Sequence, residues 1–212
     1  MRKTIKKDWT RKELDHYLEG MTATTIATDI HVEGNHRVLD LSEMEELLQK
    51  AEIISQQTCY CREKLGNCIE PMDGCLSLNG EAREMIDKGE AKEVSVEEAL
   101  EALVRTYEAG LVHMAYEFEG QEGVGIICSC CSCCCHTLSA TLRFGYKDHA
   151  FKSKLISVQD IEKCNDCGIC VERCQFGARE MVEGTLIYNE QMCFGCGPCM
   201  TCPQDAIKMV ER

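Results

Sequence analysis

Eighteen cysteines occur in this chain of 212 residues, and their spacing limits what the chain can fold around more than any other feature. They form three groups: Cys59, Cys61, Cys68 and Cys75; then Cys128, Cys130, Cys131, Cys133, Cys134 and Cys135; then eight between Cys164 and Cys202. Disulfides at this density are typical of exported proteins, whereas a reducing cytosol favours metal thiolates. So many oxidisable thiols also indicate an anaerobic setting. We therefore expect the cysteines to bind metal.

The rest of the composition indicates a cytoplasmic location. No apolar run approaches the roughly 20 residues that span a bilayer, so we expect no membrane span. The basic start of the chain, residues 1–8, lacks the apolar region of a secretion signal. The formal charge of -13 would repel nucleic acid and suits docking to a basic patch on a redox protein.

The last cysteine group has the spacing of iron-sulfur ligands. Cys164, Cys167, Cys170 and Cys174 follow the pattern C-x2-C-x2-C-x3-C. Two-residue gaps let one tight loop present three thiolates to one cube, while the fourth cysteine serves a neighbouring cube. A second copy, Cys193, Cys196, Cys199 and Cys202, aligns with the first as an internal repeat in which Gly168 matches Gly197 and Ala178 matches Ala206. Zinc sites use C-x2-C pairs with a longer gap between them, so the triple spacing favours iron and sulfur.

With both motifs present, residues 155–212 resemble the bacterial-type two-cluster ferredoxins. The resemblance implies a pseudo-twofold α+β fold with two [4Fe-4S] clusters, low-potential transfer of single electrons, and short strands beside each motif, such as Leu186–Tyr188. It also implies two crossed ligand sets. One cluster would bind Cys164, Cys167, Cys170 and Cys202, and the other Cys193, Cys196, Cys199 and Cys174.

Two positions depart from the ferredoxin pattern. Gln175 replaces the proline that usually follows the fourth cysteine, which would loosen the turn without removing a ligand. Only two residues separate Cys199 from Cys202, and on a helix that omission rotates the thiol by about 100° unless the turn is non-helical. Pro203 favours Cys202 as a ligand. The alternative is a cluster with an open or foreign-ligated iron corner, or a three-iron cluster.

Residues 1–150 predict a separate cysteine-rich, metal-binding domain of helices plus a β-hairpin, followed by a ferredoxin-like domain at 151–212. Helix-start signals at Thr10/Glu13, Ser42/Glu45 and Ser95/Glu98 predict capping boxes, and the last of these helices should end near Gly110. Residues 111–118 and 124–127 predict two strands joined by a turn. A helix followed by a hairpin is typical of winged-helix proteins. This hairpin carries glutamates and no basic stripe, so we expect no nucleic-acid binding.

The six thiols from Cys128 to Cys135 cannot all face one metal ion. As a helix, the run would put Cys128, Cys131 and Cys135 on one face and Cys130, Cys133 and Cys134 on another. As a strand, it would put Cys128, Cys130 and Cys134 on one face and Cys131, Cys133 and Cys135 on the other. Either period gives three thiols per face, to be completed by Cys59, Cys61, Cys68 and Cys75. One additional cubane, two clusters, one larger cluster, structural zinc and a metal-free store of thiols all remain open.

The order of the segments also resembles a group of ferredoxin-related proteins from anaerobes. The resemblance is carried by a C-x-C-R element, a capped helix ending in Glu-Ala-Gly-Leu-Val-His, and a cysteine-crowded run before a two-cluster module. It implies an anaerobic setting and no particular reaction. Arg62 would donate hydrogen bonds to cluster sulfurs or lie on the surface. His113, His136 and His149 are candidate ligands or plain core and surface histidines, and His136 lies nearest to the cysteine run.

The sequence predicts an electron carrier, or the electron-transfer subunit of an anaerobic oxidoreductase complex, more than an enzyme by itself. Dinucleotide-binding and P-loop motifs are absent from the sequence. One alternative is a redox enzyme in which an unusual N-terminal cluster binds or reduces a small substrate. Another is a reductive activator or cluster scaffold for a partner enzyme.

Overall fold

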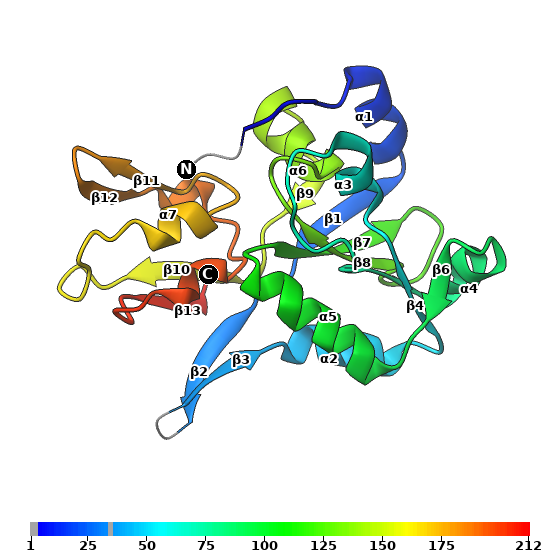
Figure 1. Ribbon diagram of the computed structural model, residues 1–212, viewed down its shortest axis with the longest axis horizontal. Coiled ribbons are helices and arrows are strands. Elements are labelled where there is room, and N and C mark those ends of the chain that lie inside the picture. The colour runs from blue at the N-terminus through cyan, green and yellow to red at the C-terminus, as the bar shows by residue number, and fades with distance from the viewer. Residues whose placement is uncertain (1–3, 34–35) are drawn as a thin grey trace.

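The main element of the fold is a seven-stranded sheet (Figure 1). The computed structural model describes residues 4–33 and 36–212. The strand order is β6-β4-β5-β8-β7-β1-β9, and every pairing is antiparallel except that of β1 with β9. The strands are β1 (Met21–Thr25), β4 (Ile54–Gln57), β5 (Cys75–Leu78), β6 (Ala91–Glu93), β7 (Val112–Phe118), β8 (Ile126–Cys130) and β9 (Ala150–Phe151).

Helices cover both faces of this sheet (Figure 1). On one face lie α2 (Ser42–Lys50) and α5 (Val96–Glu108), whose apolar side chains form a core with Leu76 and Ile127. On the other face lie α1 (Arg11–Leu18), α3 (Tyr60–Leu65) and α6 (His136–Ser139), which continues into a π-helical turn at Ala140–Phe144. The remaining helix of this part, α4 (Asn79–Asp87), packs beside β6.

The register of the central strands sets the direction of three cysteines. Cys75 lies opposite Cys128, Cys128 lies opposite Met114, and Val112 lies opposite Cys130. Directly opposite residues of an antiparallel pair share a face of the sheet. All three thiols therefore face the side that α1, α3 and α6 cover.

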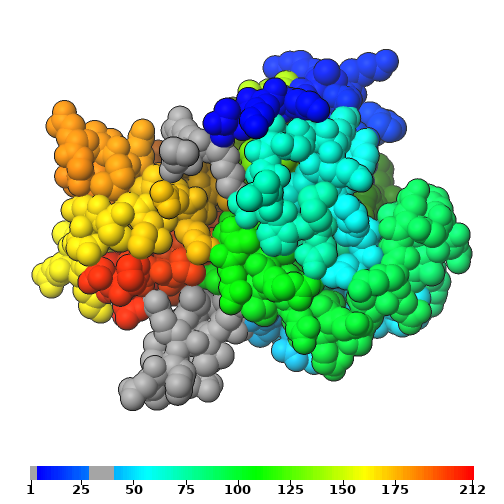
Figure 2. Space-filling model, in the orientation of Figure 1, coloured from blue at the N-terminus to red at the C-terminus, as the bar shows by residue number. Residues whose placement is uncertain are grey.

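Residues 153–212 pack at one end of the sheet, against α5, as the yellow-to-red and green atoms of Figure 2 show. Here β10 (Leu155–Gln159) pairs with β13 (Ile207–Glu211), and β11 (Arg179–Val182) pairs with β12 (Thr185–Tyr188). The first cysteine motif is followed by α7 (Ile169–Arg173), and the second contains the 3-10 helix Pro198–Thr201 after a shorter one at Glu190–Met192. A further hairpin, β2 (Asp29–Glu33) with β3 (His36–Asp40), leaves the end of β1.

Helices and strands are mixed, as the sequence predicts, but the N-terminal sheet is larger than the expected hairpin. The capping boxes at Thr10 and Ser95 are formed. The one predicted at Ser42 is wrong, because α2 begins at Ser42 with Leu41 as its N-cap and no side-chain cap bond. The expected hairpin is the β7–β8 pair, although β8 continues into the cysteine run. Within the described ranges, none of the helices has the length and apolar character needed to cross a bilayer.

Candidate metal centres

The cysteines carry no disulfides and gather into four sets. Two sets lie in the C-terminal segment, where each lines its own pocket. The outer set is Cys164, Cys167, Cys170 and Cys202, and the inner set is Cys174, Cys193, Cys196 and Cys199. The other two sets lie on the sheet face under α1, α3 and α6. The tetrad is Cys68, Cys131, Cys133 and Cys134, and the six-cysteine ring is Cys59, Cys61, Cys75, Cys128, Cys130 and Cys135.

The two C-terminal sets have the same members as the crossed ligand sets that the ferredoxin resemblance implies. Cys202 joins the outer set despite its shortened spacing. The turn before it, Pro198–Thr201, is a 3-10 helix that starts after a left-handed Gly197, and Cys202 itself has a non-helical backbone. The non-helical geometry removes the rotation that an α-helix would impose.

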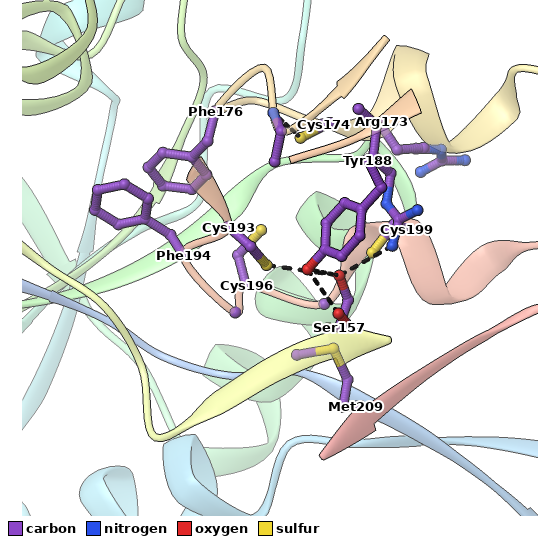
Figure 3. Close-up of a pocket in the computed structure, with 14 residues that line it drawn as sticks. Ser157, Arg173, Cys174, Phe176, Tyr188, Cys193, Phe194, Cys196, Cys199 and Met209 are labelled. Carbon is purple, nitrogen blue, oxygen red and sulfur yellow. Dashed lines mark hydrogen bonds between the residues drawn. The ribbon is translucent and has the colours of Figure 1, made fainter. Parts of the chain in front are cut away.

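Hydrogen-bond donors surround the inner set, as Figure 3 shows. The Ala178 N–H donates to the Cys174 sulfur at 3.2 Å, and the Ser157 hydroxyl lies 3.5 Å from the Cys193 sulfur. The Tyr188 hydroxyl donates to the Ser157 carbonyl at 2.6 Å. Burial raises the pKa of Cys193, but hydrogen bonds from Tyr188 and Ser157 outweigh it and lower the pKa overall. Four thiols with donors aimed at their sulfurs are a suitable donor set for a [4Fe-4S] cluster.

Arg179 is a buried cation between the two C-terminal sets that sequence reasoning missed. Its side chain is only 3% exposed and donates to Ser157 Oγ and to the Gln159 amide oxygen, both at 3.0 Å. Burial raises the pKa of Cys199, to about 11, and also raises the pKa of Cys170. The charge of Arg179 opposes this rise at both thiols but does not cancel it. A signal was present in the internal repeat, since Arg179 stands where the second copy has the apolar Ile207.

Gln175 joins the inner set to the N-terminal cysteine run. It directly follows Cys174, and its side-chain oxygen accepts hydrogen bonds from the backbone N–H and the hydroxyl of Ser132, at 2.9 and 2.8 Å. Its amide nitrogen donates to the Gly110 carbonyl at 2.8 Å. Next to it, the rings of Phe176 and Phe194 stack with centroids 4.1 Å apart. The glutamine that replaces proline at 175 therefore fixes this turn through its side-chain hydrogen bonds, whereas the sequence led us to expect a looser turn.

The tetrad brings four sulfur atoms unusually close together. Within the tetrad, Cys68 lies 3.8 Å from Cys131 and 3.9 Å from Cys134, and Cys133 lies 3.5 Å from Cys131 and 3.9 Å from Cys134. All of its sulfurs fall within 4.8 Å of one another. Hydrogen bonds from the three other thiols hold the pKa of Cys131 far below its usual range.

The cysteine run divides in a way that neither of the predicted periods gives. Strand β8 ends at Cys130, and a tight turn follows, in which the Cys135 N–H donates to the Cys131 carbonyl at 3.0 Å. As a result Cys131, Cys133 and Cys134 turn towards Cys68, while Cys128, Cys130 and Cys135 face the ring. Both face assignments made from the sequence are wrong, although the division into three and three is as expected.

The six-cysteine ring surrounds a cavity of about 210 Å³. Each thiol shifts the pKa of two neighbours, in the closed order Cys59, Cys61, Cys135, Cys130, Cys128, Cys75. Hydrogen bonds from Cys61 and Cys75, with the charge of Arg62, lower the pKa of Cys59 to about 3. The cavity is therefore lined by several thiols of which at least one is ionised at neutral pH.

Arg62 is the fixed positive charge of this cavity. Its side chain is 2% exposed, so the alternative of a surface arginine is wrong. One guanidinium nitrogen donates to the Ser129 carbonyl at 2.8 Å, while Nε and Nη2 find no acceptor among the described residues. Burial lowers the pKa of Arg62, but the surrounding thiolates outweigh it and raise the pKa. Buried donors without acceptors are costly, so the cavity is suited to an anionic group with acceptor atoms, such as a sulfide-bridged iron cluster.

Only one of the three candidate histidines lines a cysteine cavity. His136 does so and stacks on Tyr17, with ring centroids 5.7 Å apart. His113 is buried between the hydroxyls of Thr28 and Thr106, each 3.3 Å from a ring nitrogen, and is a core residue. His149 lies near the Met21 carbonyl, away from the cysteines of the four sets.

Comparison with known proteins gives one family match. The model of the 4Fe-4S binding domain matches residues 158–180, which contain the first cysteine motif. Comparison with curated proteins finds no similar sequence. With the cysteine sets described above, this match identifies the chain as an iron-sulfur protein with at least one [4Fe-4S] binding motif.

Proposed function

We propose that the chain is an electron-transfer protein that relays single electrons through two C-terminal [4Fe-4S] clusters and a further iron-sulfur cluster in the six-cysteine ring. The outer and inner sets would each hold one cubane in a pseudo-twofold, ferredoxin-like domain at 151–212. Bound there, such clusters supply one-electron chemistry at low potential, about -400 mV in ferredoxins. The protein contributes position, hydrogen bonds and charge.

The observation that carries this proposal is the Gln175 contact. One residue after an inner-set ligand, Gln175 makes two hydrogen bonds to Ser132, which lies between two tetrad ligands. Cys174 and Cys196 of the inner set also pack against the core that contains Cys131 and Cys133 to Cys135. The inner-set cysteines therefore pack against the same hydrophobic core as Cys130 and Cys135 of the ring, and this shared core would hold the two centres in a fixed arrangement for electron transfer.

The outer set is the natural point of contact with a partner. Cys167 is the exposed cysteine of the chain, and Ile161 beside the first motif is 79% exposed. The net charge of -13 favours a partner with a basic docking patch. We propose a redox protein as this partner, within an anaerobic oxidoreductase complex.

Anaerobic purification followed by iron and sulfide analysis and spin-resonance titration tests the proposal. We expect more iron and sulfide than two [4Fe-4S] clusters contain, and signals that appear one electron at a time. Cys167→Ser should reduce the C-terminal iron only, and Cys61→Ser should reduce the additional iron only. A colourless protein, or zinc in both C-terminal sets, would contradict the proposal.

A second function is favoured by the cavity of the ring. A space of about 210 Å³ with two unsatisfied guanidinium donors can also receive a small anionic substrate beside the cluster. Azide tests this function as a probe anion. It should change the spin-resonance spectrum of the reduced chain and leave that of Arg62→Met unchanged. An identical spectrum with and without azide would leave electron transfer as the function of the ring.

A further inference from the structure

The four sulfurs of the tetrad differ in spacing from the other cysteine sets. In the part of the chain that the structure describes, the tetrad is the one group in which at least three candidate ligand atoms of His, Cys, Asp or Glu all lie within 4.8 Å of one another. The inner and outer sets, with their ferredoxin spacing, do not reach this closeness. In a cubane each thiolate binds its own iron at a separate corner, so its sulfurs are held further apart than four that share one ion.

The spacing in the tetrad matches a tetrahedron around one metal ion. A zinc-sulfur bond is about 2.3 Å long, and the edge of a tetrahedron is about 1.63 times that, or about 3.8 Å. Of the sulfur–sulfur separations in the tetrad, four are 3.5, 3.8, 3.9 and 3.9 Å, and the others lie within 4.8 Å. Four thiols at this spacing leave no space for the bridging sulfides of a cluster.

The tetrad is largely buried, with Cys68 as its partly exposed member. Cys131, Cys133 and Cys134 are at most 1% exposed, and none of the tetrad lines the ring cavity. Neighbouring side chains hold the backbone of the turn. The Trp9 indole donates to the Cys134 carbonyl at 2.8 Å, and the Asn67 amide donates to the Cys133 carbonyl at 2.7 Å. Structural zinc sites are four-coordinate and closed in this way, whereas catalytic ones keep an open position.

We propose that Cys68, Cys131, Cys133 and Cys134 bind a single zinc ion, separate from the iron-sulfur centres. The ion would tie the loop after α3 to the turn that follows β8, two segments that lie more than sixty residues apart in the chain. It would thereby hold the ligands of the ring in place. The sequence spacing conceals the site, because its C-x2-C pair, Cys131 and Cys134, lies inside a run of six cysteines, and Cys68 lies far from that run in the chain.

The test uses the full chain, purified without oxygen and reconstituted with excess iron and sulfide. Metal analysis should then find one zinc ion per chain besides the iron. X-ray absorption at the zinc edge should show four sulfur neighbours at about 2.3 Å and no iron neighbour. This readout does not depend on any activity, and the iron content of the C-terminal sets reports separately on the proposed function.

Matched variants assign the ion to the tetrad. Cys68→Ser should lose the zinc or exchange one sulfur neighbour for oxygen, while the C-terminal iron stays. Cys61→Ser, at a ring residue in the preceding helix α3, should keep all four sulfur neighbours. Circular dichroism shows whether each variant is folded, and Cys68→Asp provides a second variant with a ligand that zinc accepts. Three results would overturn the proposal: the absence of zinc after reconstitution, iron in place of zinc at this site, or a zinc content and sulfur coordination that neither change at Cys68 affects.

Discussion

Replacement of Arg62 by methionine should lower the midpoint potential of the iron-sulfur centre that we propose for the six-cysteine ring. Reduction adds one negative charge to the ring, and Arg62 is the buried cation beside it, only 2% exposed. Two of its donors, Nε and Nη2, have no acceptor in the described part of the chain and are free for the bound group. Methionine keeps most of the volume of the arginine side chain and removes its charge. The reduced state, which carries one more negative charge, therefore loses more electrostatic stabilisation than the oxidised state.

The magnitude follows from the burial of this charge. At an effective dielectric constant of about 20, a unit charge some 4–8 Å away contributes about 2–4 kcal/mol. For a one-electron couple, about 1.4 kcal/mol corresponds to 59 mV. We therefore expect a decrease of about 90–170 mV. Arg62→Lys should give a smaller decrease, because lysine retains the charge but loses the planar fork.

The measurement is an anaerobic redox titration followed by spin resonance, with Arg179→Met as the matched control. Arg179 is the corresponding buried cation of the C-terminal segment, so its replacement should lower the potentials there and leave the ring centre unchanged. A ring potential that stays within about 20 mV of the original after Arg62→Met, or that rises, would refute the assignment of Arg62 to the ring, because such a shift is far below the Coulomb estimate.

Three further predictions concern the contact between the segments and the stability of the chain. Gln175→Ala removes both bonds to Ser132, so the free energy of unfolding should fall by about 1–3 kcal/mol and electron exchange between the C-terminal and ring centres should slow in rapid-freeze spin resonance; an unchanged exchange rate would argue against this route. Gly197, at a φ of +95°, lies so close to Thr28 that the Cβ of Gly197→Ala would be 1.8 Å from the Thr28 carbonyl oxygen, so this variant should have a much lower melting temperature. Gly184→Ala is the control, because Gly184 also has a positive φ, +83°, but faces open space, and its replacement should cost only about 1 kcal/mol of stability. Equal losses of stability in the two variants would show that the close approach at Gly197 is unimportant. Burial lowers the pKa of His113 from 6.5 to about 4, so between these pH values the unfolded chain binds a proton that the folded chain does not bind. The free energy of unfolding, measured in denaturant titrations, should therefore fall by about 2 kcal/mol from pH 7 to pH 5. His113→Gln should reduce this pH dependence, and an unchanged pH dependence would contradict the assignment.

The C-terminal sets could be predicted because cluster-binding loops are local. Two-residue gaps bring Cys164, Cys167 and Cys170 to one pocket whatever the rest of the chain does. Cys202 depended on the backbone of Pro198–Thr201, for which the sequence allowed both a helical and a non-helical turn. The contact made by Gln175 could not be foreseen, because its partner Ser132 lies 43 residues away.

The N-terminal sets required tertiary information. A periodic pattern assigns faces only while one type of secondary structure continues, and the run from Cys128 to Cys135 changes from strand to turn at Cys130. The strands that were missed give little local signal. Strand β4 contains Ser55 and two glutamines, and β6 has only three residues. Such strands are formed by pairing with distant partners, and their own residue preferences play a smaller part.

The division of one octapeptide between the two proposed centres would link their assembly. From Cys128 to Cys135, three thiols face the ring and the three others face the tetrad, so neither centre has a backbone of its own. An ion that closes the tetrad would pre-arrange half of the ring before iron arrives, and removal of that ion would loosen the ring from within. The tetrad should therefore bind its ion before the ring binds iron. A different metal in the tetrad should prevent correct assembly of the cluster in the ring.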